Sequence, residues 1–287
     1  MGKIPQVRFC CSHKDEGRRL CELLREKGLS RKLITRLKRT ENGITRNGLP
    51  IRTIDILHAK DEIIISENDP GGAQPNAALN VPVLFEDEHL AVFDKPPMMP
   101  CHESIKHRGD TLSNFFAAHC PDTVFRCVNR LDRDTSGCVV VAKSRYCANM
   151  LQKSCKKTYL GICRGLELSG GRICAPIARE KESIIKRCVR EDGQYAATTF
   201  CVTQRFGEYA LCRFVLETGR THQIRCHMAY IGSPLVGDDM YGTSSELISR
   251  QALHCGEVRF VHPVTHEKLT ICAPLPDDML LVVRSKR

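Results

Sequence analysis

A stretch rich in proline, glycine, asparagine and alanine, DPGGAQPNAALN, interrupts the chain at residues 69–80. This composition favours turns and extended linkers, because proline and glycine interrupt both helices and strands. The chain has 287 residues, which is enough for one large domain and a small companion. We therefore predict a small domain over 1–68, a linker over 69–80 and a larger domain over 81–287.

The small domain shows the signals of two short helices followed by a hairpin. Leucines at helical spacing predict a helix within 17–29, and Ser30 is a typical N-cap for a second helix over 31–39. The Asn-Gly pair at 47–48 predicts a tight turn, and the apolar run at 61–66 predicts a closing strand. A small α+β domain is expected.

The second of these helices concentrates positive charge. Opposite its apolar stripe it carries five basic residues: Arg31, Lys32, Arg36, Lys38 and Arg39. Residues 1–68 hold 15 Lys or Arg against 9 Asp or Glu, in a chain whose net charge is +10. Most charge runs are solvated helix faces, but five bases with no acid among them repel one another unless an anion binds. We expect this face to bind nucleic acid.

The larger domain alternates short strands with helices. Apolar alternation and β-branched runs predict strands, whereas a 3.6-residue period closed by glycine predicts helices. Strands are expected within 81–96, 137–142, 158–165, 197–217, 253–263 and 268–276, and helices within 145–155 and 221–232. This order predicts an α+β fold with a mixed or antiparallel sheet flanked by helices.

Seventeen cysteines raise the question of disulfides or metal sites. Their number is odd, no two stand in a C-x-x-C arrangement, and most lie inside apolar runs. These features favour reduced thiols in a core over a disulfide framework or a zinc site. The N-terminus lacks the apolar segment of a signal peptide, and no apolar run is long enough to span a bilayer. We therefore expect a cytoplasmic protein that binds no metal.

Charged residues gather just before the most apolar strand. In FRCVNRLDRDTSGCVVVAKS (125–144), Asp132 stands between Arg130 and Arg133. A carboxylate that a guanidinium reaches has a depressed pKa, and an ionised carboxylate in a pocket can act as a nucleophile or a base. The alternative is a turn that Asp132 or Asp134 merely caps.

A second polar motif, ETGRTHQIRCHMAYIG (217–232), predicts a helix capped by Thr221. His222 and Arg225 would lie one turn apart, where they could meet a phosphate or an internal carboxylate. Simple packing is the alternative for His222 and His227, whose five-residue spacing does not suit a metal site. The buried stripe of the helix would be Ile224, Met228 and Ile231. In KKTYLGICRG (156–165), Tyr159 is by itself more typical of a core than of a catalytic site.

Taken together, these motifs and EDEHLAVFDKPP (86–97) resemble the RluA-type RNA pseudouridine synthases over about residues 81–279. Residues 17–66 resemble the S4 RNA-binding fold, which often precedes the catalytic domain in that family. The resemblance implies an isomerase that flips a uridine out of RNA, breaks the bond from N1 to C1′, and rejoins the uracil through C5. It implies no cofactor, and a monomer that acts on RNA, with large-subunit ribosomal RNA as the default substrate and tRNA as the second choice.

The resemblance also implies roles for individual residues. Asp132 matches the catalytic aspartate, and Arg225 matches the arginine that pairs with the aspartate. Tyr159 matches the tyrosine that packs against the flipped base and is implicated in removing the C5 proton. The expected substrate contacts are Arg130, Arg133, Thr135, Arg220 and His222, in addition to the five basic residues of the small domain. Asn129 stands where many family members have histidine.

Two rival functions stay open on the sequence. A non-catalytic RNA-binding or ribosome-assembly factor would share the basic helix, but a retired site would be expected to have lost some catalytic residues. A glycoside hydrolase needs a second acid at catalytic spacing, and none is evident. The pseudouridine synthase reading predicts that Asp132 and Arg225 lie within about 4 Å of each other, joined by two parallel hydrogen bonds.

Overall fold

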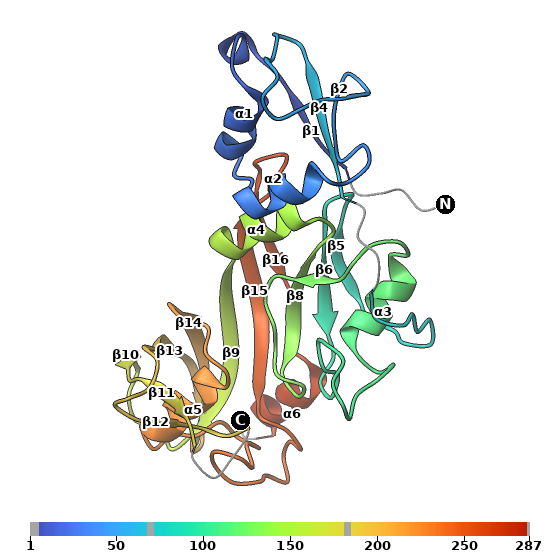
Figure 1. The fold of residues 1–287 in the computed structure, drawn as a ribbon. Coiled ribbons are helices and arrows are strands. Elements are labelled where there is room, and N and C mark those ends of the chain that lie inside the picture. The colour runs from blue at the N-terminus through green and yellow to red at the C-terminus, as the bar shows by residue number, and fades with distance from the viewer. Residues whose placement is uncertain (1–5, 68–71, 181–184, 286–287) are drawn as a thin grey trace.

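The small unit, residues 6–66, is a four-stranded antiparallel sheet with two short helices. The computed structural model of the chain describes residues 6–67, 72–180 and 185–285 (Figure 1). The sheet order is β1 (Gln6–Cys10), β4 (Glu62–Ser66), β2 (Ile44–Arg46) and β3 (Leu49–Pro50), and the helices are α1 (Leu20–Glu26) and α2 (Arg31–Leu37). Helix α2 ends earlier than expected, so Lys38 and Arg39 follow it.

Local signals in this unit work as the sequence indicates. The Ser30 hydroxyl accepts a hydrogen bond from the Leu33 N–H (3.2 Å) and so caps α2. Asn47 and Gly48 both have positive φ angles (51° and 84°), as a two-residue hairpin turn between β2 and β3 requires. The sequence analysis missed β1, which pairs with β4 along its whole length.

The large unit is built on a ten-stranded mixed sheet, which confirms the predicted fold class. Its main order is β10-β13-β14-β9-β15-β8-β6-β5, with β16 beside β15 and β7 beside β8. The only parallel pairing among the described strands joins β15 to β8. The bounds are β5 (Val83–Glu86), β6 (Leu90–Lys95), β7 (Arg126–Cys127), β8 (Ser136–Ala142), β9 (Lys156–Arg164), β10 (Gly170–Cys174), β13 (Ala197–Phe206), β14 (Tyr209–Leu216), β15 (Leu253–Val261) and β16 (Lys268–Cys272).

Four helices and a two-stranded ribbon complete the large unit. The helices are α3 (Leu112–His119), α4 (Arg145–Ser154), α5 (Gln223–Tyr230) and α6 (Asp277–Arg284), and the ribbon pairs β11 (Ile177–Arg179) with β12 (Arg187–Val189). Strand β8 is buried along its entire length, as its apolar sequence predicts. Strand β15 lies between β9 and β8 in the middle of the sheet (Figure 1).

The two units pack against each other through α4 (Figure 1). The Phe9 ring meets the Tyr146 ring edge to face, with centroids 5.7 Å apart, and Asn149 Nδ2 donates to the Gly28 carbonyl (3.1 Å). One continuous cluster of buried apolar side chains includes residues of both units. This contact fixes where α2 lies relative to the central sheet.

The predicted linker lies partly outside the described residues, which omit 68–71. Its described part, 72–80, is held against α3. Asn76 Nδ2 donates to the Gly109 carbonyl (2.6 Å), and Asn114 Nδ2 donates to the Gln74 carbonyl (2.7 Å). These bonds give this segment a fixed course.

All 17 cysteines are free thiols, and ten of them are buried. Cys10, Cys174, Cys201 and Cys272 are exposed, so the expectation of core thiols holds for most of them but not for these four. Among the described helices, none combines the length and the apolar character that a bilayer crossing needs.

Candidate active site

An open cleft of about 1070 Å³ lies where the β7–β8 loop meets the start of β9 and the segment after β14. A small recess of about 60 Å³ adjoins it and shares part of its lining. Seven residues that the sequence analysis selected line the recess together: Arg130, Asp132, Thr135, Tyr159, Arg220, His222 and Arg225. The fold thus brings motifs separated by up to 95 positions into one site.

Buried side chains fix the loop that carries Asp132. Asn129 is 6% exposed; its Nδ2 donates to the Cys138 carbonyl (3.0 Å) and its Oδ1 accepts from the Val140 N–H (2.9 Å). The carboxamide therefore uses a donor and an acceptor at once to join the loop to β8. The Thr135 N–H donates to the Asp132 carbonyl (3.1 Å), which closes a tight turn.

Lys95 supports the same loop from the end of β6. Its side chain has no exposed surface, and its ammonium donates to the carbonyls of Pro96 (2.8 Å), Met99 (2.7 Å) and Arg133 (2.9 Å). Burial lowers the pKa of Lys95 to about 8, and the three carbonyls replace the water that the ammonium has lost. The contact with Arg133 holds the residue next to Asp132 in place.

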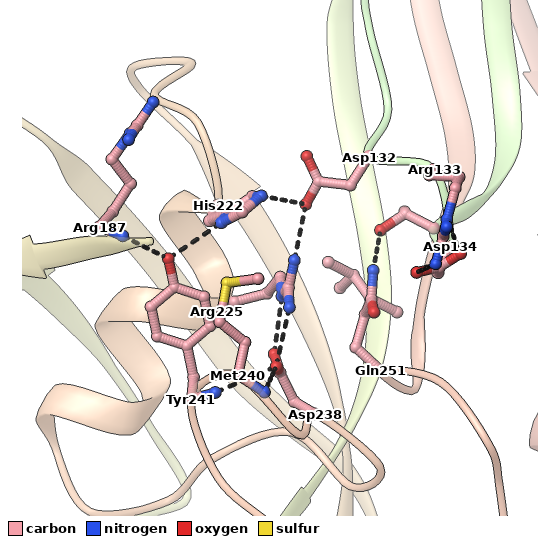
Figure 2. Close-up of polar contacts among 12 residues, drawn as sticks. Asp132, Arg133, Asp134, Arg187, His222, Arg225, Asp238, Met240, Tyr241 and Gln251 are labelled. Atoms are coloured by element: carbon pink, nitrogen blue, oxygen red, sulfur yellow. Dashed lines mark hydrogen bonds and ion pairs between the residues drawn. The ribbon is translucent and has the colours of Figure 1, made fainter. Parts of the chain in front are cut away.

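Arg225 and Asp132 form the predicted ion pair, with Nη1 3.5 Å from Oδ2 (Figure 2). The expectation of two parallel hydrogen bonds between them is wrong. The fork of Arg225 instead binds Asp238, through Nε to Oδ2 (2.7 Å) and Nη2 to Oδ1 (2.8 Å). Burial by itself lowers the pKa of Arg225, but the hydrogen bonds to Asp238 outweigh this effect, so the pKa is raised. A single amino group is left to reach Asp132.

The helix that carries Arg225 begins at Gln223, not after a Thr221 cap as expected. His222 takes the N-cap position with a left-handed backbone (φ 55°, ψ 23°), which is uncommon for a residue with a Cβ. Its Nε2 lies 3.8 Å from Asp132 Oδ2, and its Nδ1 lies 2.9 Å from the Tyr241 hydroxyl oxygen (Figure 2). Burial lowers the pKa of His222, so the ring is neutral near pH 7.

The Gln223 side chain explains why the helix starts there. Its Oε1 accepts from the Arg220 N–H (2.9 Å) and from the Thr218 hydroxyl (2.8 Å). Its Nε2 donates to the Ala197 carbonyl (3.0 Å) on β13. The buried carboxamide of Gln223 thus holds the loop before the helix, as a threonine N-cap was expected to do.

Tyr159 lies on β9, beside the recess, with 7% of its surface exposed. Burial raises the pKa of Tyr159 well above 10, and the nearby charge of Asp132 acts in the same direction. The phenol is therefore neutral at any physiological pH. It offers a flat apolar surface with a polar edge.

The arginines beside Asp132 do not hold it as the sequence analysis expected. Arg133 turns to Asp134, through Nε to Oδ1 (2.8 Å) and Nη2 to Oδ2 (3.1 Å). Arg130 is exposed and lines both the cleft and the recess. The charged partner of Asp132 is Arg225, from a different motif.

The chain was compared with known proteins. Residues 89–230 match the family model described as RNA pseudouridylate synthase. An uncharacterized RNA pseudouridine synthase of Bacillus subtilis, YjbO, is 37% identical over 91% of this chain and 96% of its own length. Ribosomal large subunit pseudouridine synthase D of Pseudomonas aeruginosa is 36% identical over 83% of this chain and 82% of its own. The chain belongs to the RNA pseudouridine synthase family.

A solved structure agrees with this assignment. Human RNA pseudouridylate synthase domain containing 1 superposes with a TM-score of 0.58 at 25% identity, over 70% of this chain and 86% of that one. The synthase is an isomerase, and the family assignment favours a catalytic protein over the non-catalytic rival.

The synthase's predicted RNA contacts lie in different parts of the molecule. The Thr135 side chain is 2% exposed and accepts a hydrogen bond from Gln251 Nε2 (3.2 Å), so it connects the loop that carries Asp132 to Gln251. The five basic residues of α2 and its end do not line the described cleft. The lysines that do so are Lys153, on α4, and Lys156 and Lys157, on β9.

Three residues that shape the synthase's site were not selected from the sequence: Lys95, Asp238 and Tyr241. Asp238 and Tyr241 both belong to GDDMYG (237–242), a stretch with two acids and an aromatic close to a glycine turn. The polar residues of that stretch could have identified Asp238 and Tyr241 as candidate site residues. Nothing in the sequence around Lys95 distinguishes a buried lysine from a solvated one.

One group of described residues has the spacing of metal ligands: Glu86, His119 and Cys120. The Lys143 ammonium lies 2.7 Å from Glu86 Oε1 and already supplies the positive charge there. Burial raises the pKa of the Cys120 thiol to about 12, so it is protonated and a poor ligand. Local ion pairing accounts for this group.

Proposed function

We propose that the synthase converts specific uridines of large-subunit ribosomal RNA to pseudouridine, with Asp132 as the nucleophile. Several similar bacterial proteins are named ribosomal large subunit pseudouridine synthase D, which favours this RNA over tRNA. The observation that carries the catalytic part is the recess itself, where Asp132, Tyr159 and Arg225 face one another.

In the proposed reaction, a carboxylate oxygen of Asp132 forms a bond to C1′ of a flipped uridine as the bond from C1′ to N1 breaks. The bonding electrons leave with the uracil as an anion, and the cation of Arg225 beside the site favours this charge. After the uracil turns, its C5 attacks C1′ and the Asp132 oxygen departs. C5 then loses its proton and N1 gains one, so the product is an isomer of the substrate.

Tyr159 is proposed to pack against the uracil while it turns. Burial raises the pKa of Tyr159 well above 10, so the phenolate that could remove the C5 proton is scarcely populated and packing suits the neutral phenol better. Arg130 and Arg220, both exposed at the mouth of the recess, are proposed to hold the RNA backbone on either side.

The organisation of the chain is part of the same proposal. Residues 1–68 would serve as an S4-like RNA-binding domain and 81–287 as the catalytic domain. Two short helices, the exposed basic residues of α2 and the Asn-Gly hairpin support the first assignment. A monomer that works in the cytoplasm, where the ribosomal RNA lies, completes the proposal, and the free thiols agree with a reducing compartment.

The test is Asp132→Asn, which keeps the shape of the side chain and removes the nucleophile. Pseudouridine formation in ribosomal RNA should fall below detection, while RNA affinity stays within about threefold, because the change removes no group that binds phosphate. The control is Asp277→Asn, the same chemical change at the exposed start of α6. Mapping pseudouridines in ribosomal RNA from cells with and without the gene identifies the site. Asp132→Asn that keeps a tenth of the wild-type rate would falsify the role of Asp132.

A further inference from the structure

The two side chains that approach the Asp132 carboxylate both approach the same oxygen. Arg225 Nη1 lies 3.5 Å from Oδ2, and His222 Nε2 lies 3.8 Å from Oδ2. In the part of the chain that the structure describes, Oδ1 has no hydrogen-bond partner. The carboxylate is therefore held from one side, and its other oxygen is left with free lone pairs (Figure 2).

The Tyr241 hydroxyl contacts Nδ1 of His222, the ring nitrogen that is not next to Asp132. The Arg187 backbone N–H donates to the Tyr241 hydroxyl oxygen (2.8 Å), and His222 Nδ1 lies 2.9 Å from the same oxygen (Figure 2). The hydroxyl has one hydrogen, and among the described residues His222 Nδ1 is the acceptor within its reach. If the hydroxyl uses this hydrogen to donate to Nδ1, the proton of the neutral ring lies on Nε2, which faces Asp132.

The backbone of His222 supports a functional reading. A φ of 55° at a residue with a Cβ costs energy, and such conformations persist where the surrounding structure imposes them. Glycine or asparagine would adopt this backbone with less strain. Histidine also occurs in this region more often than most residues with a Cβ, as His266 does in this chain (φ 61°), so the contacts of the ring carry the argument.

We infer that His222, held by Tyr241 as the Nε2–H tautomer, is a positioning residue that donates to Asp132 Oδ2 and so directs Oδ1 at the ribose. The distance of 3.8 Å is longer than a hydrogen bond, and contacts of this kind shorten when substrate closes a site. The inference rests on the proposed role of Asp132.

The experiment compares two replacements of His222 that separate the ring from the backbone. Glutamine places an N–H close to the position of Nε2, whereas asparagine is too short to do so. Single-turnover rates on ribosomal RNA should fall roughly 10- to 100-fold for His222→Asn, the range expected when a hydrogen bond to a charged group is removed. His222→Gln should be at least about tenfold faster than His222→Asn. A purely conformational role predicts the reverse order, because asparagine prefers the left-handed backbone.

The chain provides a matched control for the backbone effect. His266 also has a left-handed backbone (φ 61°), but it is exposed on the turn between β15 and β16. His266→Gln and His266→Asn should leave the rate unchanged, and their melting temperatures report the cost of each side chain in this conformation. An Asn variant of His222 that is as fast as the Gln variant overturns the inference.

A spectroscopic measurement tests the tautomer without relying on activity. Long-range ¹H–¹⁵N correlations of the histidine rings should show the Nε2–H form for the His222 signal, which is assigned by its absence in His222→Gln. Tyr241→Phe should shift that signal toward the other tautomer and slow the reaction. An Nδ1–H signal in the wild type, or no shift in Tyr241→Phe, contradicts the inference. Full activity of Asp132→Asn would instead contradict the proposed nucleophile.

Discussion

At the scale of single residues, the site depends on which carboxylates the N–H groups of the Arg225 guanidinium bind. Arg225 gives its fork to Asp238, whose side chain has no exposed surface, and one remaining nitrogen to Asp132. Asp238 also accepts at Oδ1 from the Met240 and Tyr241 N–H groups (3.3 and 3.2 Å). The geometry at Asp132 is therefore anchored to the GDDMYG turn through Arg225.

Replacements of Arg225 should separate the effect of its positive charge on turnover from the effect of its hydrogen-bond geometry. Arg225→Lys keeps a cation but cannot bind Asp238 with two parallel bonds and still reach Asp132, so turnover should be much slower with RNA affinity retained. Arg225→Ala should be nearly inactive and less stable by about 3–5 kcal/mol, because it leaves the Asp238 carboxylate buried and unpaired. Single-turnover rates and urea unfolding check both. An alanine variant as stable as wild type would mean that Asp238 is not buried as described.

The sequence pointed to Asp132 and Arg225 because each lies in a motif with unusual polar residues beside apolar ones, whereas Tyr159 was selected only through the resemblance to the pseudouridine synthases. It could not identify the partner of the Arg225 fork. The sequence offers several carboxylates that could pair with an arginine on that helix. The one that does so is decided by the tertiary fold, which buries it beside the arginine. The same limit applies to Arg133, which binds its neighbour Asp134.

At the scale of secondary-structure elements, α4 joins the two units, and Glu67 holds its first turn. The Glu67 carboxylate accepts from the Arg145 N–H (3.1 Å) and the Tyr146 N–H (3.2 Å), while the Ser144 hydroxyl caps the Cys147 N–H (3.1 Å). An anion at a helix N-terminus satisfies free N–H groups and interacts favourably with the helix dipole. Glu67 directly follows β4, so this contact connects the small unit to α4.

Glu67→Gln should loosen that connection. The amide can accept only one of the two N–H groups and has no charge, so we expect a loss of about 1–2 kcal/mol in unfolding free energy. Limited proteolysis should cut between the units faster than in wild type. Glu62→Gln is the control, because Glu62 pairs with Arg8 in an exposed ion pair worth under about 1 kcal/mol. Equal cleavage of the two variants would argue against a linking role for Glu67.

Elements with a clear apolar period were predicted, such as α1, α2, β8 and the β13–β14 hairpin. Of those missed, β1 does alternate between exposed and more buried positions, but it is only five residues long. Strand β10 is exposed at all but one position at the edge of the sheet, so its burial pattern carries no alternation. Helix α6 offered a readable signal that was not used: Pro276 at the N-cap followed by two acids in the first turn.

At the scale of the whole molecule, two basic surfaces lie on neighbouring elements. One is the exposed side of α2, and the other is the lysine-bearing lining of the cleft beside α4. The loop before α2 contacts α4 where Asn149 Nδ2 donates to the Gly28 carbonyl, so we propose that an RNA strand in the cleft continues onto α2. The net charge of +10 suits this path.

Removing charge from α2 should weaken RNA binding and reduce its dependence on salt. Lys32→Gln with Lys38→Gln should lower the slope of log K against log salt by roughly 0.7–0.9 for each phosphate that the protein no longer neutralises. The control is Lys60→Gln with Lys268→Gln, which removes the same charge from exposed positions outside α2. If both double variants change the slope equally, net charge and not the α2 surface determines binding.

The place of β15 in the sheet has a consequence for the order in which a newly made chain gains its abilities. β15 lies between β8 and β9, and it is synthesised long after both. Until it emerges from the ribosome, the strand carrying Tyr159 and the strand that follows Asp132 have no shared neighbour to align them. The N-terminal unit, in contrast, can fold early during translation. A nascent chain therefore acquires its proposed RNA-binding surface first and its chemistry near the end of synthesis.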